Sequence, residues 1–434
     1  MYDATTRSEA IVFDVVGFAS RPLQILLSEP WLLFLAFLTA ALFRPPGFLF
    51  FPWDRVVFGF LILVAAMRGF VCRGQLFLGG TVTLPLLGLL LLSLGGVVTH
   101  GFDPQAWSMF AAKWLVPFVL FQIAGQLLES PHFVERFEKF TLLALAYLIV
   151  IAIAFVVGAK ALVVPSYILD EGLGMHADRA RGPFLQAVAN GVTLNLLGLI
   201  ALNAYRRKTL RGVPALLILA GLPLSIVATK TRSVWLAFAG SVVLLLFRAP
   251  NGRLRRACTG LTLAGAMALV ACVSVTDSNR SLADRLEDRS PVEFRMAVYR
   301  AGWEMFQAKP LLGWGTDAMQ TELGKRISDF HQEEYYFHNT YLEILVERGF
   351  LGLGLYCWLA IDLFRVGRKR TLRTGGNGFL DREFRSVWPI FVLVFLVNGS
   401  FVVMNYQFVN GLLFSIAGML AAQNPLCETG VRRG

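Results

Sequence analysis

The sequence predicts an all-α fold, a polytopic transmembrane helical bundle, from its composition and its long apolar runs. Of the 434 residues, 56% are hydrophobic and only 16% are charged, whereas about 25% of the residues in a soluble domain are charged. A spanning helix needs roughly 20 apolar residues to cross about 30 Å of hydrocarbon. The composition therefore excludes a soluble enzyme, a disulfide scaffold and a disordered chain.

The long apolar runs predict about 12 spans. One larger helical periplasmic loop is expected between spans 9 and 10. The predicted organisation is transmembrane helices 1-9 over residues 1-275, a periplasmic loop domain that carries the catalytic motif over 276-340, and transmembrane helices 10-12 with a cytoplasmic C-terminus over 341-434. The expected cores are Leu23–Phe43, Val56–Val71, Leu76–Val98, Phe110–Leu128, Phe140–Val157, Ala187–Ala204, Val213–Ala228, Val234–Phe247, Ala257–Val275, Gly349–Phe364, Val387–Met404 and Phe408–Ala422.

Basic residues predict the orientation of these spans. They gather in three loops, at Arg206–Arg211, at Arg248–Arg256 and at Arg365–Arg385. Cytoplasmic loops collect Lys and Arg, so the three loops and both termini are expected in the cytoplasm. The formal net charge of +11 then reflects topology and does not indicate a nucleic-acid partner.

Four other basic residues lie in loops on the opposite, outward side. Arg179 and Arg181 belong to the loop at 158–186, and Lys230 and Arg232 flank the short turn between spans 7 and 8. Arg near the membrane core costs about 2.5–3.5 kcal/mol on insertion scales. One explanation is an ordinary loop charge, a local salt bridge or snorkelling to a headgroup. The other is an anion site at the outer face, because a guanidinium suits phosphate geometry.

The most specific pattern covers about residues 295–356. Arg295 leads an amphipathic helix, and the turn Pro310-Leu-Leu-Gly-Trp-Gly315 follows it. After a polar gap, His338 and Asn339 directly precede an apolar helix that carries Glu343, Glu347, Gly349 and Gly352. Asn339 either caps that helix or orients His338. Glu343 and Glu347 are expected to serve local helix contacts, whereas helical periodicity leaves the histidine unexplained.

This pattern resembles the motifs of the O-antigen ligases and O-antigen polymerases, which share the arginine-led helix, a P-L-L-G-x-G turn and H-N-x-Y-L-x-x-L-x-E-x-G-x-x-G. Arg181-Gly-Pro-Phe184 with Asn190, and Thr231-Arg232-Ser233, resemble two further family stretches. The chain departs from the family at 186–189, where Gln-Ala-Val-Ala precedes Asn190 and a Pro-Asn pair is more usual. That departure affects the role of Asn190.

The resemblance implies a metal-independent membrane glycosyltransferase of the bacterial inner membrane, without a cofactor. Its donor would be a glycan linked to undecaprenyl diphosphate. A ligase transfers O-antigen polysaccharide to a sugar hydroxyl of lipid A–core on the periplasmic leaflet. A polymerase extends another lipid-linked glycan, and a third branch glycosylates protein Ser or Thr. The compact outward loop and the short stretch after the last span favour the ligase.

The chemistry of this transfer assigns roles to the matching residues. His338 is the candidate catalytic base, since an ordinary histidine has a pKa of about 6.5. Arg181 and Arg232, supported by Lys230 and Arg179, would stabilise the charge that develops on the leaving diphosphate. Direct attack by the acceptor hydroxyl predicts inversion at the anomeric carbon. Residues expected to bind substrate or to support the site are Arg295, Asn339, Asn190 and Tyr341.

Two alternatives belong to other classes. A metal site at His331 and His338, with Glu333 and Glu334 between them, lacks a recognised ligand spacing, so no metal is expected. A polytopic lipid or glycan transporter would place ionisable groups near the bilayer midplane, whereas the charges here gather at the outer face. The transferase requires Arg181, Arg232 and His338 to meet in one cavity at the outer leaflet, walled by the loop Thr276–Phe337 and open sideways to lipid.

Overall fold

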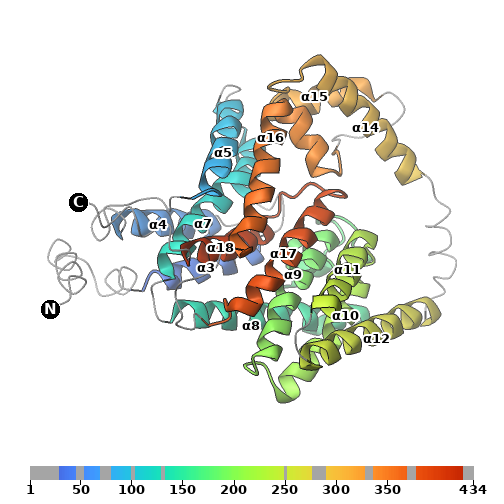
Figure 1. Cartoon of the computed structure of the whole chain (residues 1–434). Helices are drawn as coiled ribbons and strands as arrows, with labels where there is room; N and C mark the ends of the chain where they lie inside the picture. The colour runs from blue at the N-terminus through green and yellow to red at the C-terminus, as the bar shows by residue number, and fades with distance from the viewer. Residues whose placement is uncertain are drawn as a thin grey trace, which may run out of the picture.

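A computed structural model describes residues 29–44, 53–68, 80–98, 103–128, 132–248, 252–275, 290–327, 336–368 and 378–423, and these residues form helices and no strand (Figure 1). The α-helices are α3 (Trp31–Leu42), α4 (Trp53–Arg68), α5 (Thr83–Val98), α6 (Pro104–Phe110), α7 (Val116–Leu127), α8 (Phe133–Val156), α9 (Ala187–Arg206), α10 (Gly212–Ala228), α11 (Arg232–Arg248), α12 (Gly252–Val275), α14 (Ser290–Ala308), α15 (Thr316–Arg326), α16 (Thr340–Arg368), α17 (Arg382–Gly399) and α18 (Gln407–Ala422). A π-helical turn, η2 (Ala111–Leu115), joins α6 to α7, and three short 3₁₀ turns, η3 (Lys160–Leu162), η4 (Ser166–Leu169) and η5 (Gly182–Phe184), lie between α8 and α9.

Each predicted apolar core overlaps a helix of the described structure. Four helical stretches are long and apolar enough to cross a membrane, namely Pro104–Leu127, α8, α9 and α16. Four shorter apolar helices accompany them: α3, α5, α10 and α18. The chain is therefore an all-helical, multi-pass membrane protein in its described part, and the count of about 12 spans stays a prediction. The chain termini, whose location was also predicted, lie outside the described residues.

The eleventh predicted core, Val387–Met404, is longer than the helix that forms there, because α17 ends at Gly399. The residues after it fold around Thr340. Its hydroxyl donates to the carbonyl oxygen of Val402 at 2.7 Å and accepts from the N–H of Met404 at 3.0 Å. The Asn410 amide donates to the Met404 carbonyl oxygen at 3.0 Å. These side chains pair backbone groups that a continued helix would have paired internally.

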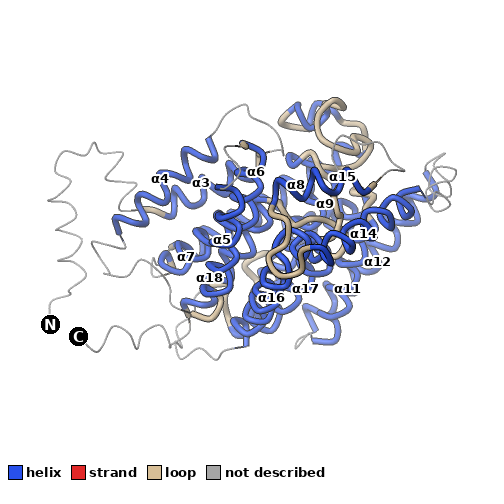
Figure 2. The backbone as a smooth tube through the Cα atoms, turned by 90° about the horizontal axis from the view of Figure 1, so that it is seen from above, coloured by secondary structure: helices blue, strands red, loops and turns tan. Residues whose placement is uncertain are grey.

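Helix α9 is the central element of the bundle. Almost all of its side chains are buried, from Ala187 to Ala204, as expected for a helix that is apolar on every face. It contacts α8, α10, α11 and α17. Helices α7 and α18 lie side by side (Figures 1 and 2). A Cβ at Gly418 would come within 2.0 Å of the Phe121 carbonyl oxygen, so a small residue permits this close helix approach.

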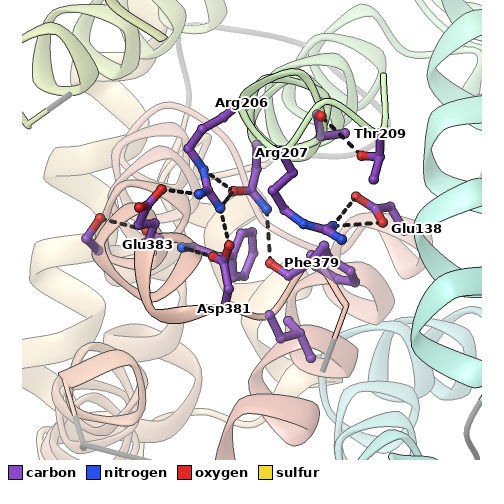
Figure 3. Close-up of polar contacts among 12 residues, drawn as sticks. Glu138, Arg206, Arg207, Thr209, Phe379, Asp381 and Glu383 are labelled. Atoms are coloured by element: carbon purple, nitrogen blue, oxygen red, sulfur yellow. Dashed lines mark hydrogen bonds and ion pairs between the residues drawn. The ribbon is translucent and has the colours of Figure 1, made fainter. Parts of the chain in front are cut away.

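One end of the bundle is held by ion pairs of the predicted cytoplasmic arginines (Figure 3). Arg207 at the end of α9 donates to both carboxylate oxygens of Glu138 on α8, at 2.8 and 3.0 Å. Arg206 contacts the carboxylates of Asp381 and Glu383 at the start of α17. We call this the basic end. These arginines therefore connect α9 to α8 and to α17, in addition to any role in setting the orientation of the spans in the membrane.

Candidate functional site

The loop at 158–186, predicted to face outward, and the turn between α10 and α11 are joined where the sequence predicted an anion site. The Asp178 carboxylate lies 3.8 Å from Arg179 Nε and 3.7 Å from Lys230 Nζ. The N–H of Ala180 donates to the carbonyl oxygen of Ala228 at 3.1 Å. Arg232 is exposed at the first position of α11, two residues after Lys230. Asp178 thus brings Arg179 and Lys230 together, and Arg232 follows Lys230 in the same turn.

Arg181 is buried within its own loop, with a side chain only 1% exposed. Its Nε and Nη2 donate to the Ile168 carbonyl oxygen at 3.2 and 3.1 Å. Its Nη2 and Nη1 also contact the carbonyl oxygens of Asp170 and Leu173. These contacts occupy four of the five N–H groups that a guanidinium carries. Bidentate binding of a diphosphate by Arg181 would therefore require at least one loop carbonyl to give up its contact.

Asn190 fixes the same loop onto the first turn of α9. The buried Asn190 amide donates to the Ala180 carbonyl oxygen at 2.8 Å. Gly182 has φ +56°, and a Cβ there would lie 2.8 Å from Asn190 Oδ1. The glycine of the Arg181-Gly-Pro-Phe184 stretch therefore permits both the left-handed turn and the approach of Asn190. Asn190 supports the loop in this structure.

Backbone strain is concentrated in the same region. Among the described residues, five that are not glycine have positive φ, and four of them lie here. They are His176 (54°), Leu185 (52°), Lys230 (48°) and His338 (49°). Such conformations cost on the order of 1–3 kcal/mol each and cluster at functional sites. The strain is an independent feature that points to this end of the bundle.

His338 is half-buried immediately before α16. Burial lowers the pKa of its imidazole, and the positive charges of Arg295 and His176 lower it further. The imidazole is therefore neutral near pH 7 and able to accept a proton. His176 belongs to the loop at 158–186 and Arg295 to α14, so two segments distant in sequence lie near enough to His338 to act on its charge.

The helix that follows His338 is anchored at its start. The Asn339 side chain accepts hydrogen bonds from the N–H groups of Tyr341 and Leu342, at 3.0 and 3.1 Å, which is the geometry of a helix N-cap. The Tyr341 hydroxyl donates to the Leu396 carbonyl oxygen of α17 at 2.7 Å. Asn339 and Tyr341 thus fix the position from which His338 projects.

Helix α16 is broken at Gly349, where φ is +62° and ψ is −161°. The Pro310–Gly315 turn fills the break. The N–H of Phe350 donates to the Pro310 carbonyl oxygen at 2.8 Å, and the N–H groups of Trp314 and Gly315 donate to α16 carbonyls at 3.0 Å. A Cβ at Gly349 would lie 2.3 Å from the Leu311 backbone. The glycines of the two motifs therefore permit the close approach of the turn and the broken helix. We call this contact, between Pro310–Gly315 and residues 346–351 of α16, the interlock.

A buried group of charges lies beside this break and was not foreseen from the sequence. Lys113, in the π-helical turn η2, forms an ion pair with Glu343 and lies 3.8 Å from Glu347. Arg348 lies 3.3 Å from Glu347, and Thr316 of α15 donates to the same carboxylate at 2.5 Å. Glu343 and Glu347 thus bind other elements rather than serving local helix contacts. The available signal was a single lysine within an apolar run, because intramembrane charges usually have a partner.

The cavity next to Lys113 is small, about 30 Å³, which is room for one or two water molecules. It is lined by Thr340 and Glu343 from the first half of α16 and by Tyr356 and Leu359 from the second half. Neither this cavity nor the one at the basic end is lined by Arg181, Arg232 or His338. The shared cavity expected for these three residues stays a prediction.

The described residues contain no group of three or more His, Cys, Asp or Glu side chains arranged to hold a metal ion. His331, Glu333 and Glu334, which formed the alternative metal site, lie outside the described residues.

A comparison with protein families matches residues 214–357 to the family described as O-antigen ligase. The matched part contains Lys230, Arg232, Arg295 and His338, and both members of the interlock at Gly349. Arg179, Arg181 and Asn190 precede it. A comparison with curated proteins gives no match. The family match confirms the resemblance that the motifs indicated.

Proposed function

We propose that this chain, whose family match supports membership of the O-antigen ligase superfamily, is a glycosyltransferase of the bacterial inner membrane. It transfers O-antigen polysaccharide from undecaprenyl diphosphate to a sugar hydroxyl of lipid A–core. The reaction takes place at the periplasmic leaflet, at the end of the bundle that holds His338. The basic end and both termini face the cytoplasm, and about 12 spans cross the membrane.

The observation that carries this proposal is the environment of His338. A half-buried imidazole with a lowered pKa accepts the proton of the acceptor hydroxyl while that oxygen attacks the anomeric carbon. The bond between the anomeric carbon and the diphosphate oxygen breaks, and the lipid diphosphate leaves with the electron pair. A positioned general base typically contributes about 10²- to 10⁴-fold in rate. Attack from the face opposite the leaving group inverts the anomeric configuration.

The leaving diphosphate is assigned to the basic surface at Lys230 and Arg232, with Arg179 beside it. Asp178 holds Arg179 and Lys230 near one another. A bound diphosphate would pair with these two cations in place of the carboxylate. Cations placed where charge develops stabilise the transition state more than the ground state. Arg181 then positions the loop through its carbonyl contacts.

A lipid or glycan transporter is the second candidate, since α16 is broken and charges are buried beside the break. Transporters use broken helices to expose backbone groups to an ion or substrate. Here the Pro310–Gly315 turn pairs the freed groups of Val346, Glu347 and Phe350. Paired charges and a filled break favour a structural role for these features, so the transferase is the better supported function.

The test is product formation by the purified protein with an undecaprenyl-diphosphate glycan donor, with and without lipid A–core, in the presence of EDTA. We expect glycan on lipid A–core, and no lengthening when the acceptor is omitted. A ladder of longer lipid-linked glycans without lipid A–core would instead indicate a polymerase. If the donor is not consumed in either reaction, and the glycan lipid instead crosses the membrane of liposomes that contain the protein, the transferase proposal is wrong and transport is the function.

Two matched pairs of variants test the site. His338→Ala should lose about 10²- to 10⁴-fold in rate, whereas His132→Ala, an exposed histidine at the start of α8, should retain activity. Arg232→Ala should weaken catalysis, and Arg255→Ala, on α12 near the basic end, should not. Equal activity in all four variants would contradict the site. Product configuration measured by NMR tests the predicted inversion.

A further inference from the structure

Two adjacent leucines project from the turn that fills the break in α16. Leu311 is 72% exposed and Leu312 is 63% exposed, although the turn itself is fixed by backbone hydrogen bonds to α16. Phe350 and Leu351, on the other side of the interlock, are 59% and 50% exposed. The turn and α16 together present four large apolar side chains, which need an apolar environment to cover them.

This apolar group continues an exposed stripe along α16. Trp358 and Ile361 are also exposed, and their spacing from Phe350 and Leu351 places them on one face of the helix. The helix is long and apolar enough to cross a membrane, so this face is the one that meets lipid chains. The backbone hydrogen bonds from Phe350 to Pro310 and from Leu351 to Leu311 place the turn at the N-terminal end of that stripe.

The backbone of the turn is suited to a lipid environment. Pro310 has no N–H, and its carbonyl oxygen accepts from Phe350 at 2.8 Å. The N–H groups of Gly313, Trp314 and Gly315 donate to carbonyl oxygens at 3.2, 3.0 and 3.0 Å. Irregular backbone enters hydrocarbon only when its polar groups are paired, and the three glycine and tryptophan N–H groups and the carbonyl oxygens of Pro310 and Leu311 meet this condition.

The residues around the turn are those found at a membrane–water boundary. Trp303 is 51% exposed, and its ring lies 5.2 Å from that of Phe306, which in turn lies 4.9 Å from that of Phe350. The Lys309 ammonium lies 4.0 Å from the centre of the Trp314 ring. Trp at the headgroup level and Lys reaching toward water are typical of this boundary.

We propose that the Pro310–Gly315 turn lies in the lipid leaflet next to it, with Leu311 and Leu312 among the acyl chains and Trp303 and Lys309 at headgroup level. The α14–α15 unit is then not a purely aqueous loop but a helical pair attached to the bilayer at its turn. The occupant of the surface is bilayer lipid, because the surface is continuous with the lipid-facing stripe of α16. The proposal does not depend on the transferase activity.

The test places an environment-sensitive fluorophore, NBD, on Leu312→Cys in the full-length protein, after replacement of its native cysteines by serine. The protein is reconstituted in phosphatidylcholine liposomes with doxyl-labelled lipid or with aqueous iodide. Thr321→Cys, an exposed polar position on α15, is the matched control. Leu311→Cys provides a second site if the first variant does not fold.

We expect doxyl lipid to quench most of the fluorescence at Leu312 and iodide to have little effect, with the reverse result at Thr321. Quenching of Leu312 by iodide alone would overturn the proposal, since the leucine would then face water. Protection from both quenchers would also overturn it, because another copy of the chain or a different protein segment would then cover the turn.

Discussion

Replacing Lys113 by methionine removes one of two cations from a buried group of four charges. The side chains of Lys113, Glu343, Glu347 and Arg348 are 9%, 7%, 3% and 4% exposed, and their formal charges sum to zero. Methionine keeps most of the length of the lysine, so packing changes little. The variant leaves a buried carboxylate without its cation, which costs about 3–5 kcal/mol. The folding equilibrium constant should fall roughly 10²- to 10⁴-fold.

The double variant Lys113→Met/Glu343→Gln separates charge from packing. It restores a neutral group, so we expect it to recover more than half of the loss, a coupling of about 2 kcal/mol or more. The assay is a denaturant titration of the protein in detergent, which gives the free energy of unfolding of each variant. Lys139→Met is the control, because Lys139 and Glu135 form an exposed pair one helical turn apart, whose loss should change the free energy of unfolding little. A double variant that costs as much as the two single variants together would refute the reasoning.

Two further outcomes follow from the site and the interlock. The kcat/KM of the proposed transferase reaction should rise with pH, with a midpoint below the ordinary histidine pKa of about 6.5, because burial and Arg295 lower the pKa of His338. Arg295→Gln should move that profile to higher pH, and an unmoved profile would contradict the assignment of His338 as the base. Gly349→Ala should destabilise the protein by about 2 kcal/mol or more, since its Cβ would overlap the Leu311 backbone. Gly354→Ala, which meets open space on the same helix, should instead stabilise it by about 0.5–1 kcal/mol, and equal effects of the two substitutions in thermal unfolding would contradict the interlock.

Local chemistry made much of the fold predictable. A long apolar run satisfies its backbone groups by forming a helix, and each predicted core overlaps a helix of the described residues. Asn339 precedes an apolar helix and caps it, which was one of its two predicted roles. The motif around His338 made the resemblance recognisable because it is contiguous in sequence, and the matched residues 214–357 contain it. Hydropathy could not foresee that α17 ends at Gly399, since that end depends on contacts of Thr340 from another helix.

Composition, apolar runs and a contiguous motif were enough to predict a helical membrane protein and the residues that carry the motif. Which buried groups pair with one another depends on how the helices pack. Lys113 and Glu343 are 230 positions apart, and the Pro310–Gly315 turn finds its partners in the break at Gly349. The guanidinium of Arg181, a candidate for phosphate, is held by the carbonyls of its own loop. Hydropathy reports how strongly a residue avoids water, whereas the partner of a buried charge or of a freed backbone group is fixed by geometry, which is defined only once the helices have packed.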